Sequence, residues 1–384
     1  MQTVDAAGLP IGDDTPPRVM GVLNVSRESP YDPSVFDEPG PAARYVDEEL
    51  VGEGADIVDI GLESANKRFE VLSAEEELDR LDTAVETIGS VSGDPVFSIE
   101  TRYDEVAEEA LSRGFDMVND ICGFADPEMP RVCEDYGVAV VKMASPPDLE
   151  RPGAVERVDD IYDALLRGGL TEKTIVDPAF GGWSEAKTLA DDRATFRRLR
   201  EFRAIGQPIL VSINRKNFLR ELADRSTEEA LPVSLAATSM AVERGAHVVR
   251  THDVAETRDA ALVGDAFTRE RVRDGKAGVT ELDVTTVAEA RRHLAGADGS
   301  ADDATRAGGG AAEQAVSRLV AVEGLSGSAR EQLTEAVDGT PLVAVPAAET
   351  VILGGPVADL RALADTVSGS PELARALDGL RALR

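Results

Sequence analysis

Short apolar runs alternate with longer amphipathic stretches along residues 18–274, and the alternation repeats eight times. Most of the runs are rich in β-branched residues and almost continuously apolar, which is typical of strands in a parallel sheet buried on both faces. We therefore predict eight strands, at residues 18–24, 56–61, 95–100, 116–120, 138–142, 174–177, 208–213 and 247–250.

The stretches between these runs have the apolar spacing of amphipathic helices. Ser73 followed by Glu76 is a capping-box pattern at the start of one of them. Eight strand–helix units over about 250 residues predict an α/β fold, a (β/α)8 TIM barrel. A doubly wound open sheet is the alternative, but it usually stops at about six strands. Helical patterns cover, for example, residues 74–88, 103–113, 191–203 and 227–244.

Two segments flank the predicted barrel of residues 18–274: an N-terminal extension, residues 1–17, and a small α/β C-terminal domain, residues 275–384. In the second, the Gly/Ala/Asp-rich stretch at 295–313 predicts a flexible loop. Around this loop we predict strands at 279–284 and 341–346 and helices at 287–294, 314–322 and 357–367. Nothing in this domain suggests chemistry.

Polar residues stand where the predicted barrel strands end, and in this fold those ends form the active face. Each one has an ordinary structural explanation, since an Asn or Asp at a strand end often caps a turn. Asp120 and Glu63 fit that explanation, Arg215 fits an ion pair, and Lys142 fits a solvated side chain. Taken together, however, six strand-end residues are expected to converge on one site: Asn24, Glu100, Asn119, Asp177, Lys216 and Arg250.

The types of these residues suggest a ligand. Two carboxylates, an amide and a lysine suit a flat heterocycle with ring N–H donors and a carbonyl acceptor, such as a pterin. Arg250 and His252, with Asn24 nearby, suit an anionic group bridged by a divalent cation. The arrangement fits displacement of a diphosphate. With three histidines in the chain, a His-based zinc site is not expected, and His247 and His252 are expected to face different places.

The charge balance excludes some partners. The chain has 72 acidic and 40 basic residues and a formal net charge of -32. Such a surface repels nucleic acid and anionic membranes. The acidic residues are spread along the chain, which predicts a solvated halophilic surface; a specific cationic partner is the alternative.

The cysteines and the N-terminus predict a cytoplasmic protein. Cys122 and Cys133 form neither a disulfide framework nor a metal-ligand spacing, and Cys133 lies in a helical pattern that predicts a core position. The first residues lack the apolar segment of a signal peptide. No stretch is apolar enough over about 20 residues to cross a bilayer.

Seven motifs follow one another along the chain: GVLNVSRES, DIGLES, FSIET, MVNDICG, IVDPAFG, INRKNF and RTHDV. They resemble the motifs of the dihydropteroate synthases, the pterin-binding TIM-barrel family, and occur in that family's order. With the acidic composition, the chain is identified as a member from a halophilic archaeon.

The resemblance implies a reaction of folate biosynthesis, in which (7,8-dihydropterin-6-yl)methyl diphosphate and 4-aminobenzoate condense with release of diphosphate, using Mg²⁺. Asn24 would bind the metal and, with Arg250 and His252, the diphosphate; these three and Lys216 would be catalytic. Catalysis would rest on positioning and charge stabilisation. The family also commonly forms homodimers. The pterin would be bound by Glu100, Asn119, Met143, Asp177 and Lys216.

The chain departs from the family pattern mainly on the side of the second substrate. Glu100 replaces an Asp, Ala144 replaces a His, and Glu28 lies in an altered first loop. The arylamine side is assigned to residues of the second and sixth loops: Asn66, Lys67, Arg68 and Trp183. These changes leave two alternatives open. One is a pterin-binding paralogue with another acceptor, either another arylamine or methyl transfer. The other is a weakly catalytic pterin-binding accessory protein.

Overall fold

The computed structural model describes residues 1–26, 34–63, 71–149, 153, 155–181, 186–274, 278–297, 304–347 and 349–383. The chain divides into two compact units, Met1–Glu270 and Arg271–Arg384. Each unit has its own buried apolar clusters, and each is described by itself below.

The first unit is built on an eight-stranded parallel sheet with the order β8-β7-β6-β5-β4-β3-β10-β9. A parallel bridge between Val176 and Ile209 joins its first and last strands, so the sheet closes into a barrel. The predicted (β/α)8 fold is therefore confirmed. The strands are β3 (Arg18–Asn24), β4 (Ile57–Gly61), β5 (Val96–Thr101), β6 (Met117–Asp120), β7 (Ala139–Met143), β8 (Thr174–Asp177), β9 (Leu210–Val211) and β10 (Val248–Thr251).

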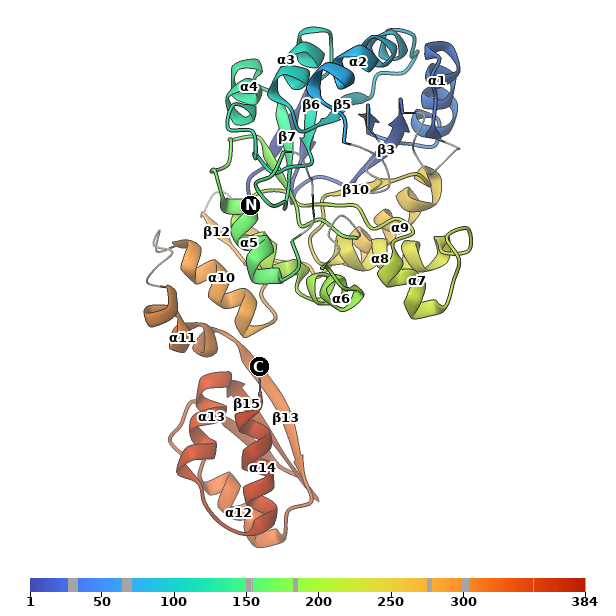
Figure 1. The fold of residues 1–384 in the computed structure, drawn as a ribbon. Helices are drawn as coiled ribbons and strands as arrows, with labels where there is room; N and C mark the ends of the chain where they lie inside the picture. The colour runs from blue at the N-terminus through green and yellow to red at the C-terminus, as the bar shows by residue number, and fades with distance from the viewer. Residues whose placement is uncertain are drawn as a thin grey trace. The chain divides into compact units, whose positions relative to one another are not determined.

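Helices surround this barrel (Figure 1). The capping box predicted from Ser73 and Glu76 is present at the start of α2. The helices are α1 (Pro39–Tyr45), η2 (Val46–Val51), α2 (Ala74–Ile88), α3 (Asp104–Ser112), α4 (Met129–Tyr136), α5 (Val158–Leu166), α6 (Leu189–Arg197), η3 (Leu199–Ile205), α7 (Asn217–Ala223), α8 (Leu231–Glu243) and α9 (Val254–Ala266). Cys133 of α4 is buried, as predicted.

The N-terminal end of the barrel is closed by residues for which the sequence pattern predicted no structure. Strands β1 (Val4–Ala6) and β2 (Leu9–Ile11) form a hairpin. Val4, Ala6 and Ile11 belong to the same buried cluster as the interior side chains at the start of the barrel strands. The hairpin therefore caps the apolar interior, and the polar strand ends lie at the opposite end, which we call the mouth.

The second unit contains a three-stranded antiparallel sheet with the order β13-β15-β14, and helices. Its strands are β13 (Ser317–Glu323), β14 (Val343–Pro346) and β15 (Thr350–Pro356), with a separate pair β11 (Arg273–Asp274) and β12 (Val279–Thr280). Its helices are α10 (Val287–Ala297), α11 (Ala304–Ala315), α12 (Gly327–Glu335), α13 (Val357–Thr366) and α14 (Pro371–Arg381).

Two predictions for this unit were wrong. The helix predicted at 314–322 is mostly strand β13, because its valines favour a strand and it pairs with β15 over its whole length. The loop predicted at 295–313 contains most of α11. Its alanines have high helix propensity, and Ala312 is buried in a cluster with Val287 and Val357. Residues 298–303 of that stretch lie outside the described part of the chain.

Among the described residues, no helix combines the length and the apolar character that a membrane span requires.

Candidate active site

Arg250 lies at the centre of the polar side chains in the mouth. Its Nε donates to Oδ2 of Asp59 at 2.7 Å, and its Nη2 donates to Oε2 of Glu100 at 2.6 Å. Burial alone would lower the pKa of the guanidinium, but the two carboxylates raise it above its ordinary value. Arg250 therefore stays charged inside the barrel and holds two acidic groups from neighbouring strands.

Asp59 was not among the predicted site residues. It lies on β4 within an apolar run and is 0% exposed. Besides Arg250, its Oδ2 accepts a hydrogen bond from Nδ2 of Asn119 at 2.9 Å. A carboxylate inside a strand that is buried on both faces is costly unless it is paired, and this was the signal that could have revealed it.

Two acidic groups of the mouth are shifted toward protonation. Burial raises the pKa of Glu100 to about 7, against the opposing charge of Arg250. Burial also raises the pKa of Asp177 to about 6, although this carboxylate accepts a hydrogen bond from the backbone N–H of Ala179 at 2.8 Å. Acids with raised pKa values in a charged cleft are typical of a functional site.

Lys216 is brought to the mouth by the packing of α7. Phe218, in the first turn of α7, stacks on Phe180 of the loop after β8, with ring centroids 5.7 Å apart. Lys216 then extends over Gly181, where a side chain would lie 3.0 Å from Cδ and 3.2 Å from Nζ of the lysine. Glycine at 181 also adopts a φ of +102°. Burial, followed by the charge of Arg250, lowers the pKa of Lys216.

Asn24 ends β3, and its amide is oriented by a hydrogen bond. Its Nδ2 donates to Oγ of Ser34 at 2.9 Å, which leaves Oδ1 available as an acceptor. Gly61 lies beside it: a Cβ at this position would be 3.4 Å from Oδ1 of Asn24 and 3.6 Å from Oε1 of Glu100. The missing side chain at 61 therefore leaves room next to two oxygen atoms.

These oxygens are suitable ligands for Mg²⁺, which prefers oxygen and often takes one or two protein ligands together with substrate phosphates and water. The described residues contain no group of three or more His, Cys, Asp or Glu side chains that could hold a metal alone. The two oxygen atoms beside Gly61 are thus donors of the type that Mg²⁺ prefers.

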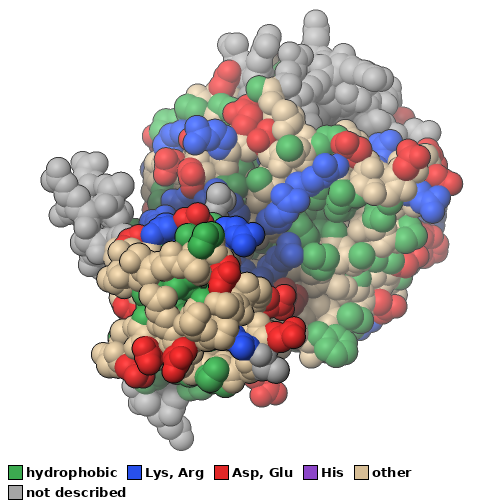
Figure 2. Space-filling model, turned by 90° about the horizontal axis from the view of Figure 1, so that it is seen from below, with side chains coloured by type: hydrophobic (Ala, Val, Ile, Leu, Met, Phe, Trp, Pro, Cys, Tyr) green, Lys and Arg blue, Asp and Glu red, His purple; other side chains and the backbone are tan. Residues whose placement is uncertain are grey.

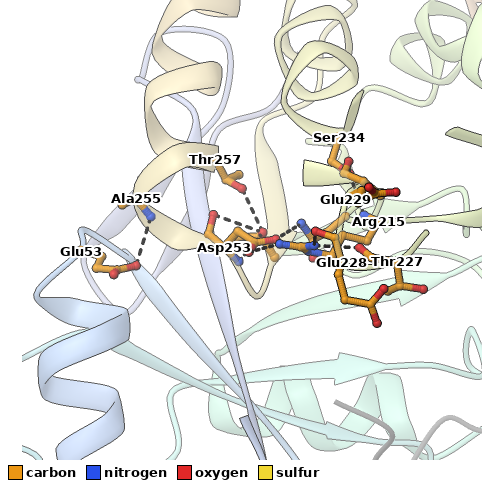
Figure 3. A network of polar contacts seen from close by, with 12 residues as sticks. Glu53, Arg215, Thr227, Glu228, Glu229, Ser234, Asp253, Ala255 and Thr257 are labelled. Atoms are coloured by element: carbon orange, nitrogen blue, oxygen red, sulfur yellow. Dashed lines mark hydrogen bonds and ion pairs between the residues drawn. The ribbon is translucent and has the colours of Figure 1, made fainter. Parts of the chain in front are cut away.

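His252 is positioned by a neighbouring ion pair. Figure 3 shows Arg215, before α7, extending to Asp253, before α9. The pair has two parallel bonds of 2.8 Å, from Nε to Oδ2 and from Nη2 to Oδ1, so the predicted ion pair of Arg215 is confirmed. It ties together the loops that carry Lys216 and His252. Burial, followed by the charge of Arg250, lowers the pKa of His252 to about 3, so its imidazole is neutral near pH 7.

Other strand-end residues have structural roles. Asp120 accepts hydrogen bonds from the backbone N–H groups of Cys122 and Phe124, as expected of a turn residue. Glu63 accepts from the backbone N–H of Leu72 and pairs with Arg102.

The prediction of a solvated Lys142 was wrong. Its side chain is 0% exposed and donates to the carbonyl of Gly169 at 2.9 Å. The ammonium also lies 4.5 Å from the ring centroid of Phe124, so carbonyl and ring contacts replace water.

The remaining predicted residues fall into three groups. Met143 is a buried residue at the end of β7. His247 lies at the opposite end of the barrel from His252, as expected: its Nδ1 accepts from the backbone N–H of Ile209, and its Nε2 lies 3.1 Å from Asp13 of the hairpin segment. The third group lies outside the described residues and comprises Glu28, Asn66, Lys67, Arg68 and Trp183.

Acidic side chains are scattered over the face shown in Figure 2, among apolar and uncharged surface and some Lys and Arg. This face has no single acidic patch.

The family described as pterin binding enzyme matches residues 20–252, a span that includes Asn24 and ends on His252. The chain belongs to this family. It is 32% identical over 255 residues to the dihydropteroate synthase of Bacillus subtilis, covering 65% of this chain and 88% of that protein. It is 34% identical over 260 residues to a probable bifunctional folylpolyglutamate synthase/dihydropteroate synthase of Halobacterium salinarum, covering 65% of this chain and 31% of that protein.

Solved structures of dihydropteroate synthases also match this chain. The dihydropteroate synthase of Thermus thermophilus in complex with 4-aminobenzoate matches with a TM-score of 0.56 and 32% identity, over 69% of this chain and 100% of that one. The dihydropteroate synthase of Coxiella burnetii in complex with pteroic acid matches with a TM-score of 0.58 and 29% identity, over 69% and 98%. This pterin-binding enzyme is thus of the dihydropteroate synthase type, a transferase of folate biosynthesis.

Proposed function

We propose that the mouth binds (7,8-dihydropterin-6-yl)methyl diphosphate and joins it to 4-aminobenzoate, giving 7,8-dihydropteroate and diphosphate. The observation that carries this proposal is the position of Arg250. Its guanidinium pairs with the carboxylates of Asp59 and Glu100, and its charge also acts on the imidazole of His252. The pterin ring and the diphosphate group of the same substrate would therefore bind in adjoining parts of one site.

The pterin would be held by polar groups that match its edge. Asp177, ionised above a pKa of about 6, would accept hydrogen bonds from ring N–H groups, and Asn119 would accept another. Lys216 would donate to the ring carbonyl. Met143, buried at the end of β7, would contact the flat face of the ring.

The bond from the pterin methylene carbon to the diphosphate oxygen would break first, with the electron pair leaving on oxygen. Arg250, which stays charged, and a neutral His252 N–H would donate to the departing diphosphate. The amine nitrogen of 4-aminobenzoate would then attack the methylene carbon and lose a proton to solvent. Such catalysis needs fixed donors more than a strong base, because the developing charge lies on diphosphate.

Mg²⁺ would be held by Oδ1 of Asn24, with Oε1 of Glu100 beside it, and would neutralise charge on the diphosphate. Their position around Gly61 supports this assignment. Glu100 stands where the family pattern has an Asp; one of its oxygens accepts from Arg250 and the other lies beside Gly61.

A second candidate is a pterin-binding paralogue that uses another acceptor. It is favoured by one observation: Ala144, where the family pattern has a His, is fully buried and has no polar side chain to offer an arylamine. Asn66, Lys67 and Arg68, which depart from the family pattern and lie outside the described residues, are assigned to the arylamine side by the resemblance alone. Arg250 and His252, which suit a diphosphate, weigh against a methyl transferase.

One assay separates these functions. The purified full-length chain is incubated at high salt with Mg²⁺, the pterin diphosphate and 4-aminobenzoate, and released diphosphate and dihydropteroate are both measured. The expected result is one diphosphate for each dihydropteroate formed. Reactions without the arylamine or without Mg²⁺ serve as controls. Tight binding of the pterin without any dihydropteroate would instead identify the paralogue.

Three broader properties are part of the proposal. A halophilic archaeal source and a salt-adapted surface are supported by the net charge of -32 and by the Halobacterium salinarum relative. A cytoplasmic location is supported by two free, buried cysteines. We also infer that residues 275–384 form a domain separate from the barrel at 18–274. We infer further that the chain forms a homodimer and has no nucleic acid or membrane partner.

A further inference from the structure

Asp59 makes contacts to two of the residues assigned to substrate, although no role is assigned to it. It is fully buried on β4. A single oxygen, Oδ2, accepts from Nδ2 of Asn119 at 2.9 Å and from Nε of Arg250 at 2.7 Å. The same oxygen therefore contacts both Asn119, which is assigned to the pterin ring, and Arg250, which is assigned to the diphosphate.

The contact with Asn119 determines which end of its amide faces the substrate. An ionised carboxylate can only accept hydrogen bonds, whereas an amide has one donor end and one acceptor end. If the amide were turned around, its Oδ1 would face Oδ2 of Asp59 with no proton between them. Asp59 thus keeps the NH₂ group of Asn119 toward itself and leaves Oδ1 as the end available to a ligand.

The contact with Arg250 fixes the guanidinium in a similar way. Asp59 takes Nε, and Glu100 takes one hydrogen of Nη2. Because the guanidinium is planar and its five donors have fixed directions, these two bonds determine where the remaining N–H groups point. A diphosphate would meet a cation that is already oriented.

Asp59 differs from the buried turn-forming acid of the same barrel. Both oxygens of Asp120 accept backbone N–H groups, so that carboxylate shapes the chain. Among the described residues, Asp59 accepts only from the side chains of Asn119 and Arg250. Its Oδ1 and Oγ of Ser98 have no hydrogen-bond partner in that part of the chain. Ser98 lies opposite Asp59 in the β4–β5 register. Asp59 therefore orients side chains and does not hold a turn.

We propose that Asp59 is a positioning residue that sets specificity for the pterin: it presents Asn119 to the ring as a hydrogen-bond acceptor and orients Arg250 toward the diphosphate. This inference rests on the proposed function only as far as pterin and diphosphate binding. It does not depend on the identity of the acceptor.

A double-mutant cycle tests it with two nearly isosteric substitutions. In the wild-type background, Asn119→Asp places two carboxylates against each other and should weaken the binding of a dihydropterin without diphosphate by about 30-fold. In the Asp59→Asn background the same substitution should cost less than about 3-fold. There the new amide at 59 donates to one oxygen of the carboxylate at 119, and the other oxygen still faces the ring.

The measurements are dissociation constants of the full chain, at high salt, for that dihydropterin and separately for inorganic diphosphate with Mg²⁺. Asp59→Ala adds a second arm and should weaken both ligands by about tenfold or more, because Asn119 and Arg250 each lose a partner. Asp13→Asn is the matched control: Asp13 is also paired with an arginine, Arg203, but at the far end of the barrel, and it should leave both constants unchanged.

The outcomes are distinct. A loss from Asn119→Asp that shrinks in the Asp59→Asn background supports the inference, since a merely structural role for Asp59 predicts equal losses in both backgrounds. Equal losses overturn it, as does unchanged binding in Asp59→Ala. If the wild-type chain binds no dihydropterin, the proposed function fails first; if it binds but forms no dihydropteroate, the cycle still decides the role of Asp59.

Discussion

The two ends of the barrel carry similar residues, but the pKa values of their acidic groups shift in opposite directions. At the N-terminal end, Nη2 of Arg203 donates to both oxygens of Asp13 at 2.8 Å, and His247 lies 3.1 Å from the same carboxylate. At the mouth, Arg250 is shared between Asp59 and Glu100, with His252 nearby on the same strand end. Each end thus combines an arginine, a histidine and acidic groups.

The pKa values show how these sets differ. Burial by itself would raise the pKa of Asp13, but the hydrogen bond from His247 and the charge of Arg203 lower it well below its ordinary value. At the mouth burial prevails, and the pKa values of Glu100 and Asp177 rise to about 7 and about 6. The far end is a satisfied pair that stabilises the hairpin, whereas the mouth holds acids that gain from a ligand.

The largest expected effect comes from removing the arginine of the mouth. Arg250→Ala should lower kcat/KM by about a thousandfold, which is about 4 kcal/mol, because it removes an oriented donor to the leaving group. Steady-state rates of diphosphate release measure this. Arg250→Lys keeps a charge without the planar geometry and should recover only part of the loss. Equal activity in the two variants would show that the geometry of the guanidinium is unimportant.

Removing the acid of the far end should change stability and leave binding intact. Asp13→Ala leaves Arg203 without its partner and should reduce the free energy of unfolding by about 3 kcal/mol. Chemical denaturation, followed by the fluorescence of the single tryptophan, Trp183, measures this change. The adjacent exposed residue gives the control, Asp14→Ala, with little expected change. A weaker dihydropterin affinity in Asp13→Ala would mean that the two ends are coupled.

A smaller effect is expected from neutralising one acid at the mouth. Asp177→Asn can still accept from the N–H of Ala179, so the loop should keep its shape. The ring loses a charged acceptor, and binding of the dihydropterin should weaken by about 2 kcal/mol. Titration calorimetry measures the affinity, and an unchanged melting temperature confirms that the fold is intact. An unchanged affinity would place the pterin elsewhere.

The smallest expected effect per measurement is a difference in the pH dependence of the free energy of unfolding between variants of the two ends. Glu100 has a folded pKa of about 7 against an ordinary value of 4.5, so between these pH values the folded chain holds a proton that the unfolded chain has released. Raising the pH through this window therefore destabilises the folded state relative to Glu100→Gln, by at most about 1.4 kcal/mol per pH unit.

Denaturation of the wild-type chain and of Glu100→Gln at several pH values tests this expectation. Asp13 stays ionised throughout the window because its pKa is lowered, so Asp13→Asn should run parallel to the wild type. Parallel curves for Glu100→Gln would show that the pKa of Glu100 is not raised.

Much of the fold and of the mouth could be predicted from local sequence. Strands buried on both faces require nearly continuous apolar runs, so β3 to β10 left a clear pattern. Lys216 and Arg250 stand just where such runs stop. In the second unit the pattern was ambiguous: the valines of β13 favour a strand, yet the segment was predicted to be a helix.

The sequence by itself determined the barrel, its family motifs and the set of polar strand ends. Only the tertiary structure decided that Asp59 holds Arg250 and Asn119, that Lys142 is buried, and that residues 1–17 include the hairpin that caps the far end. The physical reason is the range of the interactions. Apolar periodicity is imposed within each element, but the pairing of buried charges depends on residues that meet only when the barrel closes.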